Sequence, residues 1–195
     1  DSSTSRGLGD VYKRQKIFFG GMSDHYQVPT KELNYKNQLS EIKIDSTHSS
    51  ELFAVAAEKF IRDYDDSNPF FLQVSFTAPH DPRNMPQEYL KLYDTIEIDV
   101  PKNFATMHPF DNGELDIRDE WLAGYPRSRD EIKANIVAYY AMITHMDEQI
   151  GNIIQTLDEK GLRNNTIIVF TSDNGLALGQ HGLMGKQNLY EHSIK

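Results

Sequence analysis

The apolar positions of the chain recur at two spacings, and each spacing predicts a different kind of element. In residues 51–64 and 128–160, apolar side chains fall on one face at helical spacing, which predicts two amphipathic helices. Residues 70–76 (FFLQVSF) and 166–171 (TIIVFT) are short apolar runs rich in aromatic or β-branched residues, as is typical of buried strands. This order of helices and strands predicts an incomplete α/β fold with a largely parallel or mixed central sheet flanked by helices.

The ends of the two helices carry recognisable capping residues. Ser49 and Ser50 precede the first helix and are expected to cap its N-terminus. Ser128 followed by Glu131 forms a capping-box pattern at the start of the second helix, and Gly161 is expected to end it.

The segments between these elements are rich in turn-forming residues. Three prolines in residues 77–86 exclude regular structure there, and residues 87–93 predict a short helix. Residues 95–127 are polar and interrupted by Pro, Asn and Gly, which predicts a long excursion of the kind that lines or covers a site.

The first 15 residues have no amphipathic period, and we interpret residues 1–15 as a non-native leader or a flexible linker. Residues 16–195 then form one partial domain. The chain begins with Asp1 instead of Met and ends within a pattern, so we expect it to be a fragment.

Composition narrows the classes of function. The chain has 195 residues, a formal net charge of −9 and no cysteine. The acidic excess argues against nucleic acid or an anionic membrane as the main partner. Within these 195 residues, the lack of cysteine excludes disulfides, thiolate metal sites and cysteine nucleophiles. No apolar run reaches the roughly 18 residues of a membrane span, and no signal peptide is visible.

Candidate chemistry follows both predicted strands. His80 lies in the loop after the first strand, and Asp173 and Asn174 lie in the loop after the second. Ligands of open α/β sheets bind outside the carboxyl ends of the strands, so these loops are expected to wall one site. Asp-Asn-Gly is also a common turn sequence, but carboxylate and amide oxygens suit Ca²⁺ or Mg²⁺. The glycine-rich continuation could bring Lys186 back over such a metal.

These segments together resemble the sulfatase family of the alkaline phosphatase superfamily. TIIVFTSDNGLALGQHGLMGKQNLYEHSIK is similar to the family's apolar strand, Ser-Asp-Asn-Gly loop, Leu-Gly-x-His-Gly turn, lysine and Tyr-Glu pair. FFLQVSFTAPHDP resembles the family's strand that ends in a histidine followed by a proline. YYAMITHMDEQIGNIIQTLDEKGLRNNTIIVFTSDNG resembles the family's helix and strand that lead to the metal loop. The resemblance covers residues 70–195, and three linked segments in the right order are far more specific than any one of them.

The resemblance implies roles for individual residues. Asp173 and Asn174 match a pair of calcium ligands, Lys186 matches the sulfate-binding lysine, and His80 matches the histidine near the leaving-group oxygen. These roles are physically reasonable, because sulfate oxygens gain charge as the S–O bond breaks, and a divalent cation, a lysine and a histidine oppose that charge.

Other polar residues near these motifs have two readings each. Arg83 could bind a substrate anion or be a surface charge, and His181 could line the substrate pocket or satisfy backbone groups. Asp24 and His25 are placed to border the pocket, whereas His145, within the long helix, is expected to hydrogen-bond a neighbouring element.

Parts of the family pattern are missing from this chain. The family's nucleophile is a formylglycine made from the Cys or Ser of a Cys/Ser-x-Pro-x-Arg motif, and no such motif occurs here. The first aspartate pair of the metal site and a Lys-x-His motif are also missing. All three lie upstream of Lys16 in the family order, so truncation explains them better than degeneration, and the fragment alone is expected to be inactive.

The resemblance therefore predicts a hydrolase of sulfate esters, with a sulfated small molecule or glycan as its partner. Ca²⁺, with Mg²⁺ as the alternative, is the expected cofactor, and export to the periplasm or outside the cell is the family expectation. Two other functions stay open: a phosphodiesterase or phosphonate monoester hydrolase of the same superfamily, and a non-catalytic domain that binds a sulfated ligand.

Overall fold

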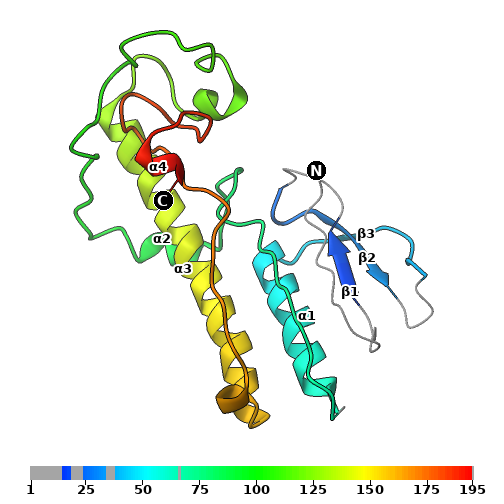
Figure 1. Ribbon diagram of the computed structural model, residues 1–195. Helices are drawn as coiled ribbons and strands as arrows, with labels where there is room; N and C mark the ends of the chain where they lie inside the picture. The colour runs from blue at the N-terminus through cyan, green and yellow to red at the C-terminus, as the bar shows by residue number, and fades with distance from the viewer. Residues whose placement is uncertain (1–14, 19–23, 34–37, 66, 195) are drawn as a thin grey trace. The chain divides into compact units, whose positions relative to one another are not determined.

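The computed structural model describes residues 15–18, 24–33, 38–65 and 67–194 (Figure 1). The chain forms two compact units, each of which we describe by itself. The first unit comprises residues 1–91 and 141–166, and the second comprises residues 92–140 and 167–195. The predicted leader lies outside the described residues except for Gln15, with which the first strand begins.

The first unit contains a three-stranded antiparallel sheet. Strands β1 (Gln15–Phe18), β2 (Val28–Leu33) and β3 (Lys43–Asp45) lie in the order β1-β2-β3. Along β2, Val28 and Thr30 are buried and alternate with less buried neighbours, as expected for a strand with one covered face.

Helix α1 (Ser49–Asp63) confirms the first predicted helix, with a different cap. Ser49 and Ser50 were expected to cap it, but they lie inside the helix, because Nδ1 of His48 accepts a hydrogen bond from the Ser50 N–H at 3.1 Å. A histidine nitrogen thus replaces the serine hydroxyl as the acceptor for an N–H group of the first turn. The buried apolar residues of the helix are Leu52, Ala54, Ala57 and Ile61.

The predicted strand at residues 70–76 is wrong. The segment runs along α1 without a sheet partner among the described residues (Figure 1), and aromatic contacts hold it there. Phe76 packs edge-on against Phe53 and Phe70 against Phe60, with ring centroids 6.3 and 5.5 Å apart. Its apolar side chains therefore pack on a helix, and apolar packing alone does not make a strand without ladder hydrogen bonds. Helix α2 (Gln87–Lys91) confirms the short helix predicted after the proline-rich loop.

Helix α3 (Arg129–Glu159) confirms the longest predicted element. Gly161 follows it with a φ of 69°, and Leu162 N–H donates to the Leu157 carbonyl at 2.9 Å, so the helix ends in the predicted way. At the other end, half of the predicted capping box forms: the Ser128 hydroxyl accepts from the Glu131 N–H at 3.5 Å, whereas the Glu131 carboxylate accepts from the Gly124 N–H at 3.1 Å and not from the Ser128 N–H. Of the helices in the described residues, none combines the length and apolar character needed to cross a membrane.

The second unit is built around an apolar core with little regular structure. Its core residues come from the excursion, the first turns of α3 and the glycine-rich segment: Val100, Ala123, Ile132, Ile136, Leu178 and Met184. The 3-10 helix η1 (Arg118–Leu122) interrupts the excursion, and α4 (Glu191–Ile194) closes the unit. A further 3-10 helix, η2 (Arg163–Asn165), belongs to the first unit.

The predicted strand at residues 166–171 is also wrong within this chain. The segment pairs with no strand of the described residues, and Ile167, Val169 and Phe170 are 92%, 78% and 75% exposed. A central strand needs a neighbour on each side, and here the described residues offer none. The parallel or mixed central sheet is therefore not formed by the part of the chain that the structure describes, although its helices are.

Candidate functional site

The six predicted site residues divide between the two units. His80 and Arg83 lie in the first unit, and the other four lie in the second: Asp173, Asn174, His181 and Lys186. We call residues 77–84 the histidine loop and residues 182–187 the lysine loop. That the histidine loop and the loop with Asp173 and Asn174 wall one site stays a prediction.

Hydrogen bonds set the orientation of the His80 ring in the histidine loop. The His80 N–H donates to the Thr77 carbonyl at 3.0 Å, and ring atom Nδ1 lies 3.1 Å from the carbonyl oxygen of Asp81. A carbonyl can only accept, so Nδ1 carries a proton in this contact. Nε2 is then the ring nitrogen that can face a substrate.

Two buried histidines outside the loop bind its backbone, one in the middle and one at the end. Nε2 of His25 donates to the carbonyl of His80 at 2.9 Å, and Nε2 of His48 donates to the carbonyl of Asn84 at 3.2 Å. The Asn84 amide in turn donates to Asp24 at 2.7 Å. The His25 and His48 rings stack with centroids 5.1 Å apart. Residue His80 therefore lies on a loop fixed by residues far away in sequence.

The other ring nitrogens of these histidines act as acceptors. Nδ1 of His25 lies 2.7 Å from the Ser49 hydroxyl, and Nδ1 of His48 caps α1. Burial lowers the pKa of His25, and burial together with the neighbouring His145 lowers the pKa of His48 to about 4. Both rings are therefore neutral near pH 7, with the proton on Nε2.

His145 packs edge-on against His48 and confirms the structural role predicted for it. Its ring centroid lies 4.4 Å from that of His48, and Nε2 lies 3.2 Å from a carboxylate oxygen of Glu51 on α1. Burial lowers the pKa of His145, although Glu51 opposes the shift.

The guanidinium of Arg83 is paired within the histidine loop. Its Nε lies 3.2 Å from Oδ1 of Asp81, and only 7% of the Arg83 side chain is exposed. A substrate anion would have to compete with this carboxylate for Arg83. The role of Arg83 in anion binding therefore stays a prediction.

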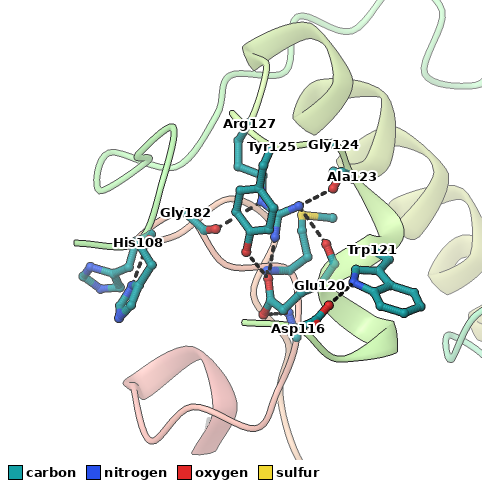
Figure 2. Close-up of polar contacts among 12 residues, drawn as sticks. His108, Asp116, Glu120, Trp121, Ala123, Gly124, Tyr125, Arg127 and Gly182 are labelled. Carbon is teal, nitrogen blue, oxygen red and sulfur yellow. Dashed lines mark hydrogen bonds and ion pairs between the residues drawn. The ribbon is translucent and has the colours of Figure 1, made fainter. Parts of the chain in front are cut away.

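In the second unit, a buried ion pair holds the lysine loop (Figure 2). Nη2 of Arg127 contacts Oε2 of Glu120, and neither side chain is exposed. The Glu120 carboxylate also accepts from two successive peptide groups, Met184 N–H at 2.9 Å and Gly185 N–H at 3.0 Å. These two peptide groups come directly before Lys186.

The residue before Glu120 holds the other side of Lys186. Oδ2 of Asp119 accepts from the Gln187 amide at 2.9 Å, and the Gln187 side-chain oxygen accepts from the Lys186 N–H at 2.9 Å. Partial burial raises the pKa of Asp119, but hydrogen bonds from Gln187 and Arg118 and the charges of Arg118 and Lys186 bring it below its usual value. The Lys186 charge therefore acts on Asp119.

Asp173 and Asn174 are exposed at the start of the glycine-rich segment. Oδ1 of Asp173 accepts from the Asn174 N–H at 3.0 Å, and the Ser172 hydroxyl donates to the Asn174 carbonyl at 2.8 Å. Their carboxylate and amide oxygens fit Ca²⁺ in kind, but they supply few of the six to eight oxygens it takes. Among the described residues, no group of three or more His, Asp or Glu side chains could hold a metal ion.

The His181 ring accepts a hydrogen bond at Nε2 from the Asn103 side-chain amide at 3.0 Å and stacks on an aromatic ring, and its main chain is also bound. Its N–H donates to the Asn103 carbonyl at 2.8 Å, and its own carbonyl accepts from Nδ1 of His108 at 2.9 Å. The ring lies parallel to Tyr190 with centroids 4.3 Å apart. His181 has a φ of 55°, in the left-handed region that non-glycine residues seldom adopt, so these contacts hold it in place.

Four residues that position the loops were missed or only loosely placed by sequence reasoning. Only His25 was near a predicted role, as a residue bordering the pocket, while His48, Glu120 and Arg127 had none. Each lies tens of residues from the loop it holds, so no local spacing connects them. The only sequence signal for a buried pair was that Glu120 and Arg127 lie near apolar residues of the excursion.

Comparison with known proteins agrees with this arrangement of loops and helices. The chain superposes on the crystal structure of yidJ from Bacteroides fragilis, provisionally assigned as a sulfatase, with a TM-score of 0.66 and 28% identity over 89% of this chain and 35% of that one. It is 36% identical over 138 residues to an arylsulfatase of Clostridium perfringens, which covers 70% of this chain and 28% of that protein. It is 33% identical over 137 residues to iduronate 2-sulfatase of Mus musculus, covering 64% of this chain and 25% of that protein.

The fold is thus part of an α/β domain of the alkaline-phosphatase-like class. The model of the sulfatase family matches residues 5–195, and the chain belongs to that family. It spans from about a quarter to about two fifths of the length of the curated relatives it matches.

Proposed function

We propose that this chain is part of a sulfuric ester hydrolase, which cleaves the S–O bond of a sulfate ester with water. The observation that carries the proposal is the family match over residues 5–195, because it includes His80, Asp173, Asn174 and Lys186. We call the protein that contains this chain together with the remainder of the domain the complete enzyme.

Lys186 and His80 have distinct tasks in this proposal. The Lys186 ammonium group binds a sulfate oxygen and opposes the negative charge that grows on the group as the ester bond breaks. His80, carrying a second proton on Nε2 in addition to the one on Nδ1, donates the Nε2 proton to the leaving alcohol oxygen. The contact between Nδ1 and the Asp81 carbonyl supports this assignment, because it leaves Nε2 as the ring nitrogen available to a substrate.

A divalent cation is the proposed cofactor. Asp173 and Asn174 would supply two of its oxygen ligands, and the others would come from outside the described residues. Bound there, Ca²⁺ would stabilise the charge on the sulfate oxygens. The nucleophile, expected to be a formylglycine, is also proposed to lie outside this chain.

The exposed apolar segment supports the idea of a larger domain. Ile167, Val169 and Phe170 expose apolar side chains that a folded domain would bury against a neighbouring strand. We infer that the complete enzyme pairs this segment as the central strand predicted from its sequence.

The proposed substrate is a sulfated carbohydrate. One relative is named iduronate 2-sulfatase and another arylsulfatase, so the names alone do not decide. Trp121 adds a physical reason: its indole is 68% exposed, and its Nε1 donates to Asp116 at 3.1 Å, which fixes the ring (Figure 2). A fixed, exposed aromatic ring provides a large apolar contact area for a sugar at little entropic cost.

The test compares the complete enzyme with the 195-residue chain. The complete enzyme should release inorganic sulfate from an aryl sulfate, Lys186→Ala should reduce kcat/KM by about 100-fold, and the 195-residue chain should show no turnover. Sulfate release that is unaffected by Lys186→Ala would overturn the assignment of the lysine. Binding of a sulfated sugar without any turnover would indicate a non-catalytic domain instead.

Trp121→Ala separates the two substrate classes. If the substrate is a sulfated carbohydrate, this variant should raise KM for a sulfated oligosaccharide and leave KM for a small aryl sulfate unchanged. Equal effects on both substrates would contradict the carbohydrate proposal.

A further inference from the structure

The buried pair of Glu120 and Arg127 forms hydrogen bonds with the backbone of the lysine loop. Nε of Arg127 donates to the carbonyl of Gly182 at 3.1 Å, and Glu120 accepts from the N–H groups of Met184 and Gly185. The first and the last two residues of the turn that precedes Lys186 are thus held by one ion pair (Figure 2).

The pair is itself fixed in place. Nη1 of Arg127 donates to the carbonyls of Glu120, at 2.7 Å, and Ala123. The guanidinium carbon lies 3.7 Å from the centre of the Tyr125 ring, and the Tyr125 hydroxyl lies 3.4 Å from Oε2 of Glu120. Neither charge is exposed, so neither can reach a substrate directly.

Stability alone is a weak reason for such a pair. Removing two charges from water costs several kcal/mol per ion, and apolar side chains of similar volume often give equal or greater stability. What apolar residues cannot do is accept two successive peptide N–H groups, and that is the contact Glu120 makes. The pair therefore specifies the position of the turn.

The close fit of the turn supports the same reading. A Cβ atom on Gly185 would lie 2.6 Å from Oε1 of Gln187 and 3.0 Å from Oε1 of Glu120. On Gly182, which has a φ of 77°, it would lie 2.5 Å from the carbonyl carbon of Met107. The glycines of the loop allow the backbone to approach these groups, and any shift of the turn would be carried to Lys186.

We propose that Glu120 and Arg127 are positioning residues for the sulfate-binding lysine: they fix residues 182–185 so that the Lys186 ammonium group is held where a sulfate oxygen binds. This inference rests on the proposed function. Neither residue was a candidate in the sequence, and neither touches the substrate.

The test is a double-mutant cycle between Glu120 and Lys186 in the complete enzyme. Glu120→Gln keeps the size of the side chain but puts an amide where both peptide N–H groups need acceptors. We expect kcat/KM for an aryl sulfate to fall by about 100-fold, as for small displacements of groups at a reacting centre. Inhibition by inorganic sulfate should weaken in parallel.

The cycle separates positioning from general damage. If Glu120 acts through Lys186, adding Glu120→Gln to a Lys186→Ala enzyme should cause less than a threefold further loss. Multiplied effects of the two substitutions would overturn the inference. A Lys186→Ala enzyme with normal activity would instead contradict the proposed function.

A second variant covers the case in which Glu120→Gln does not fold. The joint replacement of Glu120→Leu and Arg127→Met removes both charges and should fold, yet it should still lose sulfate inhibition and activity to the same degree. Full activity in that variant would overturn the inference. Asp99→Asn is the matched control, because Asp99 forms exposed ion pairs with Arg129 and Lys133 in the same unit and should leave kcat/KM unchanged.

Discussion

His25 holds His80 by its backbone: ring atom Nε2 of His25 donates to the His80 carbonyl at 2.9 Å, although 55 residues separate them in sequence. The Ser49 hydroxyl, 2.7 Å from Nδ1, fixes the tautomer that makes this possible. The orientation of the proposed proton donor thus depends on a neutral histidine buried behind it.

The first prediction follows from this contact. His25→Leu in the complete enzyme should lower kcat for an aryl sulfate by roughly tenfold, because the His80 loop loses its hydrogen-bond donor and shifts. KM should change little, since Lys186 is untouched. His25→Gln should recover much of the loss, because its amide can donate to the same carbonyl. Equal activity of the Leu and Gln variants would contradict a positioning role.

The second prediction concerns pH and the cluster of His25, His48 and His145. The pKa of His48 is about 4 in the folded protein, against an ordinary 6.5, and the pKa values of His25 and His145 are also lowered. The unfolded chain therefore binds more protons below pH 6.5, so stability is full above that pH and falls as the pH drops toward 4. His25 and His145 disfavour the charged form of His48, and Asp24 favours it only weakly.

Urea unfolding of the complete enzyme between pH 4 and pH 8 measures this dependence. His48→Asn removes one titrating ring but keeps an acceptor that can cap α1, so its free energy of unfolding should vary less with pH. The dependence should not vanish, because His25 and His145 remain. An unchanged slope in the Asn variant would show that His48 does not titrate in this range.

Helices and the residues of the recognised motifs could be predicted from the sequence, because both depend on local patterns. The 3.6-residue period of α1 and α3 lies within each segment, and Gly161 ends α3 by its own conformational freedom. His80 and Lys186 were predicted as site residues from motifs in continuous stretches, and their roles stay predictions. The strand predictions at 70–76 and 166–171 failed because a strand is defined by its partners, and composition does not say which partners are present.

The residues that position the two loops were not predicted, for a related reason. Glu120 and Lys186 are linked through the peptide groups of Met184 and Gly185, a contact over more than 60 residues. A buried charge is recognised by its burial, which a sequence of mixed polarity does not reveal. His48 was not predicted as the N-cap of α1, because two serines follow it and serine is the better N-cap residue on average.

The third prediction is the cost of breaking the buried pair. Glu120→Gln leaves the Arg127 guanidinium buried without its counter-charge, and the free energy of unfolding should fall by about 3–5 kcal/mol. Chemical unfolding at pH 7 measures this change. Lys59→Gln breaks an exposed pair with Asp63 and should cost less than about 1 kcal/mol. Similar losses in the two variants would mean that the Glu120 pair is not shielded from water.

The fourth prediction concerns the metal. Asp173→Ala in the complete enzyme should weaken calcium binding at least tenfold and abolish calcium-dependent activity, because a hard cation loses a carboxylate ligand. Isothermal titration of the metal-free enzyme with calcium measures the affinity directly. Asp158→Ala, on the last turn of α3, removes an equal charge and should have no effect. Unchanged affinity in the Asp173 variant would remove Asp173 from the set of ligands.

The fifth prediction uses the exposed apolar segment. Val169 is 78% exposed, and its segment has no ladder partner in the described residues, so the 195-residue chain should self-associate along it. Val169→Lys should reduce this association, as measured by light scattering after size exclusion. The same substitution should lower the yield of folded complete enzyme, in which we expect Val169 to be a buried strand residue.

Val55→Lys is the control. Val55 is 58% exposed on α1, and its replacement should change neither the self-association nor the yield, because a helix has no unpaired edge. A complete enzyme that folds normally with the Val169→Lys substitution would show that residues 166–171 are not a central strand there either.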